Sequence, residues 1–373
     1  MKWGTFSLSQ IPDLSRVPEN FETDFEQFQL AEELGFDTIW IAEHLFSSYG
    51  VVTSCQVLAA AIAKATKRIK IGMAVVVMPF NHPLRTASDF ALVDILSEGR
   101  LLFGAGRAYQ PHEFVGLGIP MEDSRGMYEE AMDIMLKAWG DEPITHDGEF
   151  WTIPQPTDVL PKPVQKPHPP LYQACISPDS FKTAAQKGLG LQLASPFSYR
   201  TYREEWVDKI EESIGVYEAE CEKAGHDPKG AERMMLLPFF VHESQDEAKR
   251  IAQERMEWFY AKVTANQKSV GGQPDLIKGY ELTMAESKKT LEGGYLNFDK
   301  LYENGAAIAD DPATCAEKLN ELRERLGITE FVLWTNIGGM PAAESKAAMK
   351  LIMNEVAPRV NEMEAAANAK AAE

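Results

Sequence analysis

The sequence predicts an α/β fold, a closed (β/α)8 TIM barrel with insertions, and three observations indicate it. Short apolar runs of β type alternate with helical patterns along the 373 residues. Eight such units in one chain favour a closed parallel barrel over an open sheet. The third run, residues 69–78, is almost wholly apolar, which is typical of a parallel strand buried on both faces. We expect residues 1–373 to form a single domain.

The first half of the chain predicts four strand–helix units. Residues 2–8 form the first strand, and apolar residues then repeat at helical spacing from Phe21 to Leu34. Gly35 ends this helix, as glycine commonly does. The elements that follow are strand 38–42, helix 54–65, strand 69–78, helix 84–96, strand 101–105 and helix 127–139.

The second half continues this alternation. Its predicted strands are 171–176, 189–194, 234–241 and 331–335, and its predicted helices are 180–187, 203–224, 247–263 and 343–356. Residues 141–170 hold eight prolines and predict a surface insertion with a hairpin near 149–153. Residues 264–305 are polar and weakly periodic, which predicts a long irregular loop, either a mobile lid or a passive insertion. The alanine-rich end after Met363 is expected to fray.

Composition restricts the partners of the chain. A net charge of −19 disfavours nucleic acid and anionic lipid, so any bound phosphate would need specific arginines. The first residues lack an export signal, and no apolar run has the roughly 20 residues of a membrane helix. The four cysteines are scattered without metal-binding spacing, which predicts a reduced cytoplasmic protein with buried thiols and no metal site.

The most explicit functional motif is the SPDS run from Ser177 to Ser180, directly after the fifth predicted strand. A serine followed by a proline is typical of a helix start, whose free amides suit a phosphate. Taken alone, such a motif more often marks only a helix cap, and Asp179 weighs against an anion. Arg107 follows the fourth strand and Arg125 precedes the next helix, and arginine holds phosphate through a fixed fork of donors. Together these residues predict a phosphate site at the barrel mouth.

His44 is the candidate catalytic residue because it follows the second strand and its side chain titrates near neutrality. A structural role is about as well supported by the sequence. Glu43 precedes His44, and we expect the two side chains to diverge. The glycines at 104 and 106 lack the third glycine of a dinucleotide-binding motif, and no clear helix follows them.

The sequence resembles the bacterial luciferase superfamily of flavin-dependent oxidoreductases along nearly the whole chain. In this family an arginine after strand four, another before the next helix, and the helix start after strand five hold the flavin phosphate, which implies Arg107, Arg125, Ser177 and Ser180. The resemblance also implies flavin over a non-proline cis peptide at Ala74–Val75, and a catalytic His44. One departure is Gly106, where the catalytic subunit of luciferase has a reactive cysteine. The resemblance rests on the segments MKWGTFSL, GFDTIWIAEHLF, IKIGMAVVVMPFNHPLRTASDFALVDILSEGRLLFGAGRAY, DSRGMYEEAMDIMLKAW and SPDSFKTAAQKGLG.

The function that the resemblance implies is a two-component monooxygenase. Reduced FMN would form a flavin 4a-peroxide with dioxygen and transfer one oxygen atom to a small organic substrate. A separate NAD(P)H:flavin reductase would supply the reduced FMN, since no nicotinamide-binding motif is evident. A homodimer through the helices after strands two and three is expected, helped by a small-residue face at Ala59, Ala60, Ala61 and Ala63. Two alternative functions stay open, a deazaflavin-dependent hydride-transferring enzyme and a flavin-binding protein without catalysis. The substrate class also stays open among aldehydes, cyclic ketones, sulfonates and thioethers.

Overall fold

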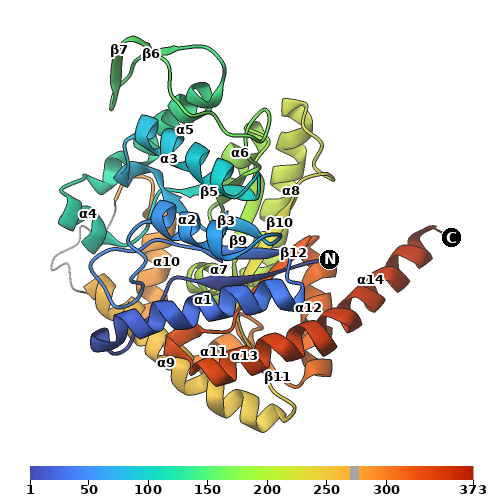
Figure 1. The fold of residues 1–373 in the computed structure, drawn as a ribbon. Coiled ribbons are helices and arrows are strands. Elements are labelled where there is room, and N and C mark those ends of the chain that lie inside the picture. The colour runs from blue at the N-terminus through green and yellow to red at the C-terminus, as the bar shows by residue number, and fades with distance from the viewer. Residues whose placement is uncertain (269–276, 373) are drawn as a thin grey trace.

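The computed structural model, which describes residues 1–268 and 277–372, contains a closed barrel of parallel strands (Figure 1). Each barrel strand pairs in parallel with the next, and the last pairs with the first, which closes the ring. This confirms the predicted (β/α)8 barrel. The eight barrel strands of the described chain are β1 (Lys2–Ser7), β2 (Thr38–Ile41), β3 (Lys70–Met73), β5 (Leu101–Gly106), β8 (Leu171–Ala174), β9 (Gly190–Ala194), β10 (Arg233–Val241) and β12 (Glu330–Trp334).

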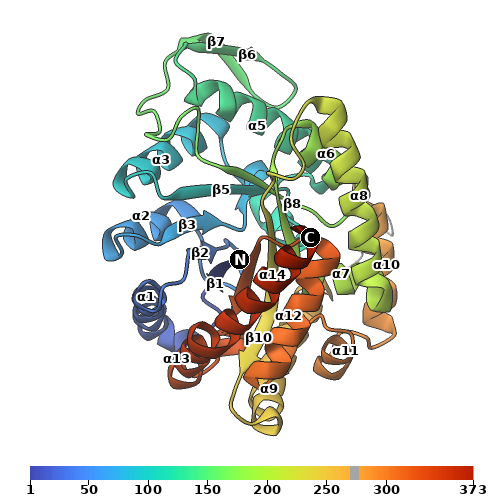
Figure 2. The same ribbon diagram turned by 90° about the vertical axis from the view of Figure 1, so that its right-hand side faces the viewer.

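Helices surround the strands. Each strand is therefore buried on both faces, one inside the barrel and one under a helix. Every residue of β10 is buried, for example, although the strand is nine residues long. Figure 2 shows the outer helices following one another around the ring. They are α1 (Val17–Leu34), α2 (Cys55–Ala65), α3 (Pro83–Leu96), α5 (Ser124–Trp139), α6 (Pro178–Gln186), α8 (Trp206–Ala224), α9 (Gln245–Lys268), α12 (Pro312–Leu326) and α13 (Ala342–Leu351).

The proline-rich insertion forms the predicted hairpin, from β6 (Ile144–Asp147) and β7 (Thr152–Thr157). Two prolines are accommodated in β7 because its only partner is β6, so one edge needs no donors. The Glu130 carboxylate of α5 accepts hydrogen bonds from the amides of Glu149, Phe150 and Trp151 at 3.0–3.1 Å. Glu130 therefore anchors the turn of the hairpin to α5, and Gln165 anchors the end of the insertion to Asp94 of α3 at 2.7 and 3.0 Å.

The prediction of a long irregular loop over residues 264–305 is wrong for the described part. Helix α9 continues to Lys268, and α10 (Glu281–Glu292) and α11 (Phe298–Glu303) follow. Residues 269–276 of the predicted lid lie outside the described residues. The sequence analysis also missed β11 (Ile308–Asp310), which pairs with the end of β10, and α12.

The chain ends in α14 (Ala357–Ala372), which extends away from the barrel (Figure 1). The fraying expected after Met363 is therefore not observed in the described residues. The terminal ammonium of Met1 pairs with the Glu364 carboxylate at 2.8 Å. None of the described helices combines the length and the apolarity needed to cross a bilayer. All four cysteines are free and buried, as the sequence predicts.

A buried carboxyl lies at the amino-terminal end of the barrel. Glu330, the first residue of β12, accepts hydrogen bonds from the Thr38 hydroxyl and from the Trp40 indole, the latter at 2.7 Å. Burial raises the pKa of Glu330 to about 7, although both hydrogen bonds act in the opposite direction. The folded protein therefore binds a proton here that the unfolded chain releases at lower pH.

We expect the unfolding free energy of the Glu330→Gln variant to change less with pH than that of the wild type. A carboxyl group whose pKa is raised on folding stabilises the protein fully at pH values below its pKa in the unfolded chain. This stabilisation is lost as the pH rises through about 7, the pKa of Glu330 in the folded protein. At 1.36 kcal/mol per pKa unit, the difference in unfolding free energy between wild type and variant should change by about 3 kcal/mol from pH 4 to pH 8. Urea unfolding at both pH values measures it, with the exposed Glu317→Gln as control. An equal difference at both pH values would contradict the assignment.

Candidate functional site

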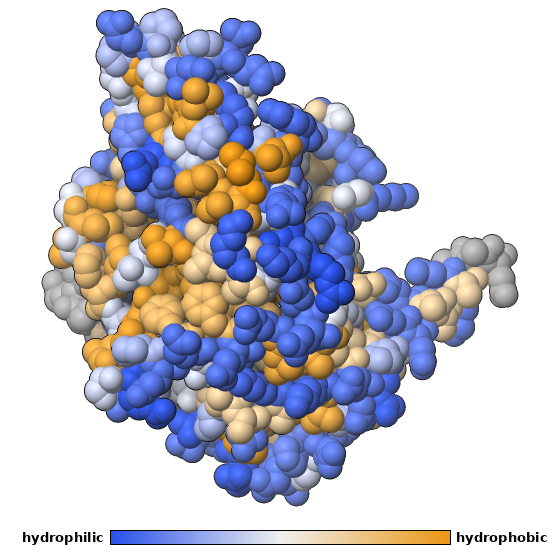
Figure 3. Space-filling view, viewed as in Figure 1, coloured by the Kyte–Doolittle hydropathy of each residue, from blue (hydrophilic) through white to orange (hydrophobic). Residues whose placement is uncertain are grey.

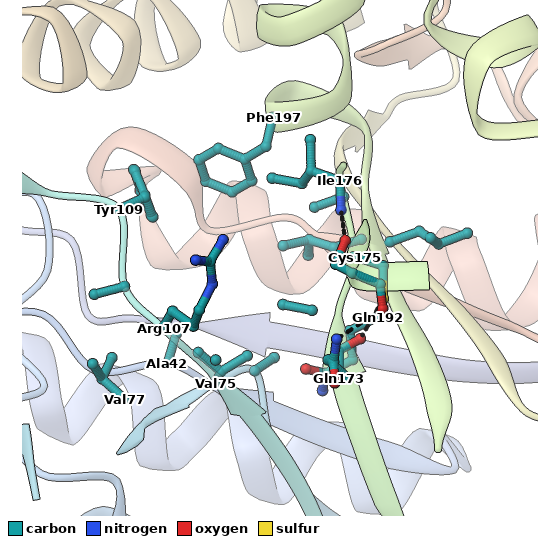
Figure 4. A pocket seen from close by; sticks show the side chains of 18 of the residues that line it. Ala42, Val75, Val77, Arg107, Tyr109, Gln173, Cys175, Ile176, Gln192 and Phe197 are labelled. Atoms are coloured by element: carbon teal, nitrogen blue, oxygen red, sulfur yellow. Dashed lines mark hydrogen bonds between the residues drawn. The ribbon is translucent and has the colours of Figure 1, made fainter. Parts of the chain in front are cut away.

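A pocket lies at the carboxyl ends of the barrel strands, where the loops after β2, β5, β8 and β9 meet (Figure 4). The strands deliver these side chains to one place because parallel strands all end at the same rim. Its lining includes every residue that the sequence predicts for the site, namely His44, Ala74, Val75, Arg107, Arg125, Ser177 and Ser180.

Two arginines converge at one side of this pocket. Arg107 Nη1 and Arg125 Nε both lie within 3.5 Å of a single point, the position of a Cβ on Gly279. Arg107 Nη2 donates to the Gly279 carbonyl at 3.2 Å, whereas Nη1 is buried without a hydrogen-bond partner. Arg125 is 3.6 Å from the exposed Asp179 carboxylate. An anion at this side would therefore meet donors that the described protein leaves unused.

Helix α6 begins in the same pocket with amides that no side chain caps. Ser177 is the N-cap residue, yet its hydroxyl makes no capping hydrogen bond. Ser180 Oγ instead accepts from the Ile176 amide at 3.1 Å and donates to the Ser177 carbonyl at 2.6 Å, which fixes the shape of the turn. The positive end of the helix and its free amides thus face the pocket beside the two arginines.

The peptide bond between Ala74 and Val75 is cis, as the resemblance predicts, and both residues line the pocket. A Cβ on Gly106 would lie 2.6 Å from Val75 Cγ2, so a cysteine at position 106 would not fit without a shift. Figure 4 shows Arg107 extending into the space between Val75 and Phe197, with Gln173 and Gln192 at the strand ends beyond it. The surface beside the cis peptide is apolar and suits a planar ring.

Gln192 of β9 crosses the barrel to donate to the Met73 carbonyl at 2.7 Å, next to the cis peptide. The crossing requires Gly104, because a Cβ there would lie 2.0 Å from Met73 O and 2.3 Å from Gln192 Nε2. Gln192 Oε1 is buried without a partner and lies in the pocket lining. Gly104 therefore serves side-chain packing inside the barrel, and Gln192 offers a free acceptor to a ligand.

His44 pairs with a carboxylate that the sequence analysis missed. Its Nδ1 lies 2.9 Å from Glu113 Oε1, which also accepts the Leu45 amide at 2.8 Å, and both side chains are buried. A carboxylate at this distance accepts the Nδ1 proton, which leaves Nε2 with a lone pair for proton transfer. The arrangement is that of a histidine oriented by an acid.

Glu113 could have been found from a signal in the sequence. It lies in α4 (Pro111–Leu117), and proline is favoured at the first position of a helix. The sequence analysis found no clear helix after Gln110-Pro111, which is wrong because α4 begins at Pro111.

Glu43 diverges from His44, as predicted. Its two oxygens accept hydrogen bonds from the Val77 amide at 2.8 Å and from the Cys55 amide at 3.3 Å. Burial raises the pKa of Glu43 to about 7, although both amide hydrogen bonds lower it. Glu43 therefore links the start of α2 to β4 (Val76–Val77) and fixes the backbone there.

The start of α10 packs over the arginine side of the pocket. The Arg107 guanidinium lies over the Tyr280 ring at 4.7 Å, and the Tyr280 hydroxyl donates to the Ala108 carbonyl at 2.9 Å. The described part of the segment predicted as a loop thus contributes to the site. Among the described residues no group of three histidine, cysteine or acidic side chains could hold a metal ion.

Comparisons with known proteins identify the family of the chain. Residues 1–330 match the family model described as luciferase-like monooxygenase. The chain is 26% identical to the alkanal monooxygenase alpha chain of the Kryptophanaron alfredi symbiont, over 97% of this chain and 99% of that protein. It is also 26% identical to the oxygenase component of the flavin-dependent trigonelline monooxygenase of Acinetobacter baylyi, over 95% and 94% of the two chains.

Solved structures share the fold. Monooxygenase RslO1 from Streptomyces bottropensis superposes with a TM-score of 0.81 at 25% identity, over 96% of this chain and 99% of that chain. The coenzyme F420 dependent tetrahydromethanopterin reductase of Methanopyrus kandleri has a TM-score of 0.70 at 20% identity, over 96% and 99% of the two chains, a likeness of fold alone. From the match over residues 1–330 it follows that the chain belongs to the luciferase-like monooxygenase family and is a flavin-dependent monooxygenase.

Proposed function

We propose that this chain is the oxygenase component of a two-component monooxygenase that uses reduced FMN. The observation that carries the proposal is the distribution of the pocket side chains. Two guanidinium groups and an uncapped helix start lie on one side, and an acid-oriented histidine faces the same cavity. The likeness to a monooxygenase oxygenase component supports a separate flavin reductase as partner.

The pocket residues fit the parts of FMN. Arg107, Arg125 and the amides at the start of α6 would hold the phosphate, with Ser177 and Ser180 beside it. Ala74 and Val75 would support the ring, and the free Gln192 Oε1 would accept one of its donors. The bound reduced flavin would supply the activation of dioxygen. The protein contributes position, exclusion of water and proton transfer.

His44 would transfer a proton to or from the reacting oxygen or the substrate. Glu113 positions it by holding the Nδ1 proton, so that Nε2 acts. The rings of Tyr49 and Tyr109 pack edge-on against the imidazole at 4.6 and 5.9 Å, and their hydroxyls are 2.6 Å apart. These aromatic walls limit the access of water to the histidine.

Labelled dioxygen separates this function from hydride transfer with a deazaflavin. The chain, a flavin reductase, NADH and FMN would be incubated with labelled dioxygen and a panel of aldehydes, cyclic ketones, sulfonates and thioethers. One labelled oxygen atom in a product supports the proposal. Turnover that requires reduced deazaflavin and leaves no label in the product would overturn it, and so would binding of FMN without turnover of any substrate.

We expect Arg107→Ala to weaken FMN much more than riboflavin, which lacks the phosphate. Loss of charge-assisted hydrogen bonds of about 1.5–3 kcal/mol corresponds to an FMN dissociation constant raised about 10- to 150-fold. Flavin fluorescence titration with both ligands measures the effect, and Arg250→Ala on the surface of α9 is the control. Equal losses for FMN and riboflavin would place Arg107 away from the phosphate.

His44→Ala should lower product formation by about 10²- to 10⁴-fold while leaving FMN affinity unchanged, because general acid–base catalysis contributes within this range. Glu113→Gln should cause a smaller loss, since the imidazole remains but its orientation is less fixed. Rates of product and hydrogen peroxide release under single turnover are the measurement. The exposed His226→Ala is the control, and an unchanged product rate in His44→Ala would remove the histidine from the mechanism.

A second copy of the chain is proposed to cover the outer face of α2 and α3. Val57, Leu92 and Ile95 expose 72%, 48% and 36% of their surface there, and Figure 3 shows hydrophobic surface over this region. Of the predicted small-residue face, Ala60 and Ala61 lie at the surface and leave room for a close approach, whereas Ala59 and Ala63 are buried against the barrel. The two helices follow β2 and β3, as expected for the predicted homodimer.

Charges on this face should separate the two copies. We expect wild type to sediment as a dimer at micromolar concentration, and Val57→Glu combined with Leu92→Glu to sediment as a monomer, because a dimer would bury the new carboxylates. Leu14→Glu, at an exposed apolar residue just before α1, is the control and should stay dimeric. A monomeric wild type, or dimeric double variant, would refute the interface.

A further inference from the structure

Arg200 is a buried cation that the proposed flavin site does not use. It lies in α7 (Ser195–Tyr202), directly after β9, and only 5% of its surface is exposed. Its side chain lines the pocket, and its Nε and Nη1 atoms are buried without a hydrogen-bond partner among the described residues. Such unused donors are rare in folded proteins and call for a partner.

Aromatic rings, not carboxylates, surround this guanidinium. It lies 5.1 Å from the centre of the Tyr109 ring and 5.4 Å from that of Phe197. Within residues 1–268 and 277–372, no carboxylate forms an ion pair with Arg200. The acid on the same side of the pocket, Glu113, is already bound to His44 and to the Leu45 amide.

The surroundings do not neutralise the charge. Burial raises the pKa of Tyr109 to about 12 and raises that of Tyr49 well above its usual value, so both phenols are neutral near pH 7. Contacts between a cation and aromatic rings offset only a small part of the cost of removing a guanidinium from water. Arginine keeps its proton in proteins, so the site holds a positive charge for which the described residues supply no counter-charge.

Arg200 and the proposed phosphate site differ in their contacts. Arg107 packs over Tyr280 and donates to Gly279, beside Arg125, whereas Arg200 packs on Tyr109 and Phe197. Tyr109 in turn packs edge-on against His44. Arg200 therefore belongs to the part of the pocket that contains the catalytic histidine.

We propose that Arg200 binds the anionic head group, a carboxylate or a sulfonate, of the organic substrate. A guanidinium offers parallel donors to two oxygens of such a group, and the rings of Phe197, Tyr109 and Tyr49 suit an apolar or aromatic body. The head group would hold the rest of the molecule beside His44. The identity of the bound molecule as substrate rests on the proposed monooxygenase function, whereas its binding does not.

Calorimetric titration without reductase or substrate turnover tests the binding. Benzoate and benzenesulfonate carry the charge, and benzamide is a neutral analogue of similar shape. Wild type with FMN bound should prefer one or both anions to benzamide by about tenfold or more, which corresponds to one charge-assisted hydrogen bond. This comparison needs no variant, and no preference for either anion would overturn the proposal.

Variants assign the preference to Arg200. Arg200→Gln should weaken anion binding about tenfold or more and leave benzamide unchanged, and Arg200→Lys should retain part of the preference because it keeps the charge. Arg250→Gln is the surface control. Unchanged anion affinity in Arg200→Gln overturns the proposal, and so does a loss confined to FMN affinity, which would assign Arg200 to the flavin.

The outcomes are separable from those of the labelled-dioxygen experiment. Anion binding through Arg200 without labelled product would refute the monooxygenase function and leave the anion site standing. Labelled product from neutral substrates, with no anion preference in the titration, would refute the anion site alone.

Discussion

Positive charge gathered at the mouth of an acidic barrel is the constraint on which the site depends. The chain carries a net charge of −19, yet Arg107 and Arg200 present buried donors without partners to one pocket. Within residues 1–268 and 277–372, neither guanidinium forms an ion pair with a carboxylate. A ligand that brings negative charge would supply the missing counter-charge, and both the proposed phosphate site and the proposed anion site follow from this.

Most of the barrel could be predicted because its strands are buried on both faces and its outer helices on one. Continuous apolar runs and a helical repeat follow directly from those environments. The elements over the barrel mouth could not be predicted in the same way. Helix α10 is polar, so its sequence resembles a loop, although Gly279 and Tyr280 directly before it contact Arg107. The three residues of β11 are too short to give a periodic signal.

The residues of the candidate site also fall into two groups, those that could be predicted from the sequence and those that could not. His44 and Arg107 directly follow strands, and the rule that parallel strands end at one rim identifies them from position alone. Glu113 joins His44 across 69 residues, a contact that no local pattern encodes. Arg200 could have been found by the same rule, since α7 begins where β9 ends. Its isolation from acids is a property of the packed structure only.

The state of the cysteines has a practical consequence. Cys55, Cys175, Cys221 and Cys315 are all buried, and burial raises the pKa of each thiol. Thiolates, which are the reactive species, are therefore scarce in the native protein. With Gly106 packed against Val75, the pocket surface beside the cis peptide carries no thiol of its own at that position. A single cysteine introduced on α10 or α4 would thus take up a maleimide fluorophore selectively, and would report on movements over the barrel mouth in an otherwise unmodified protein.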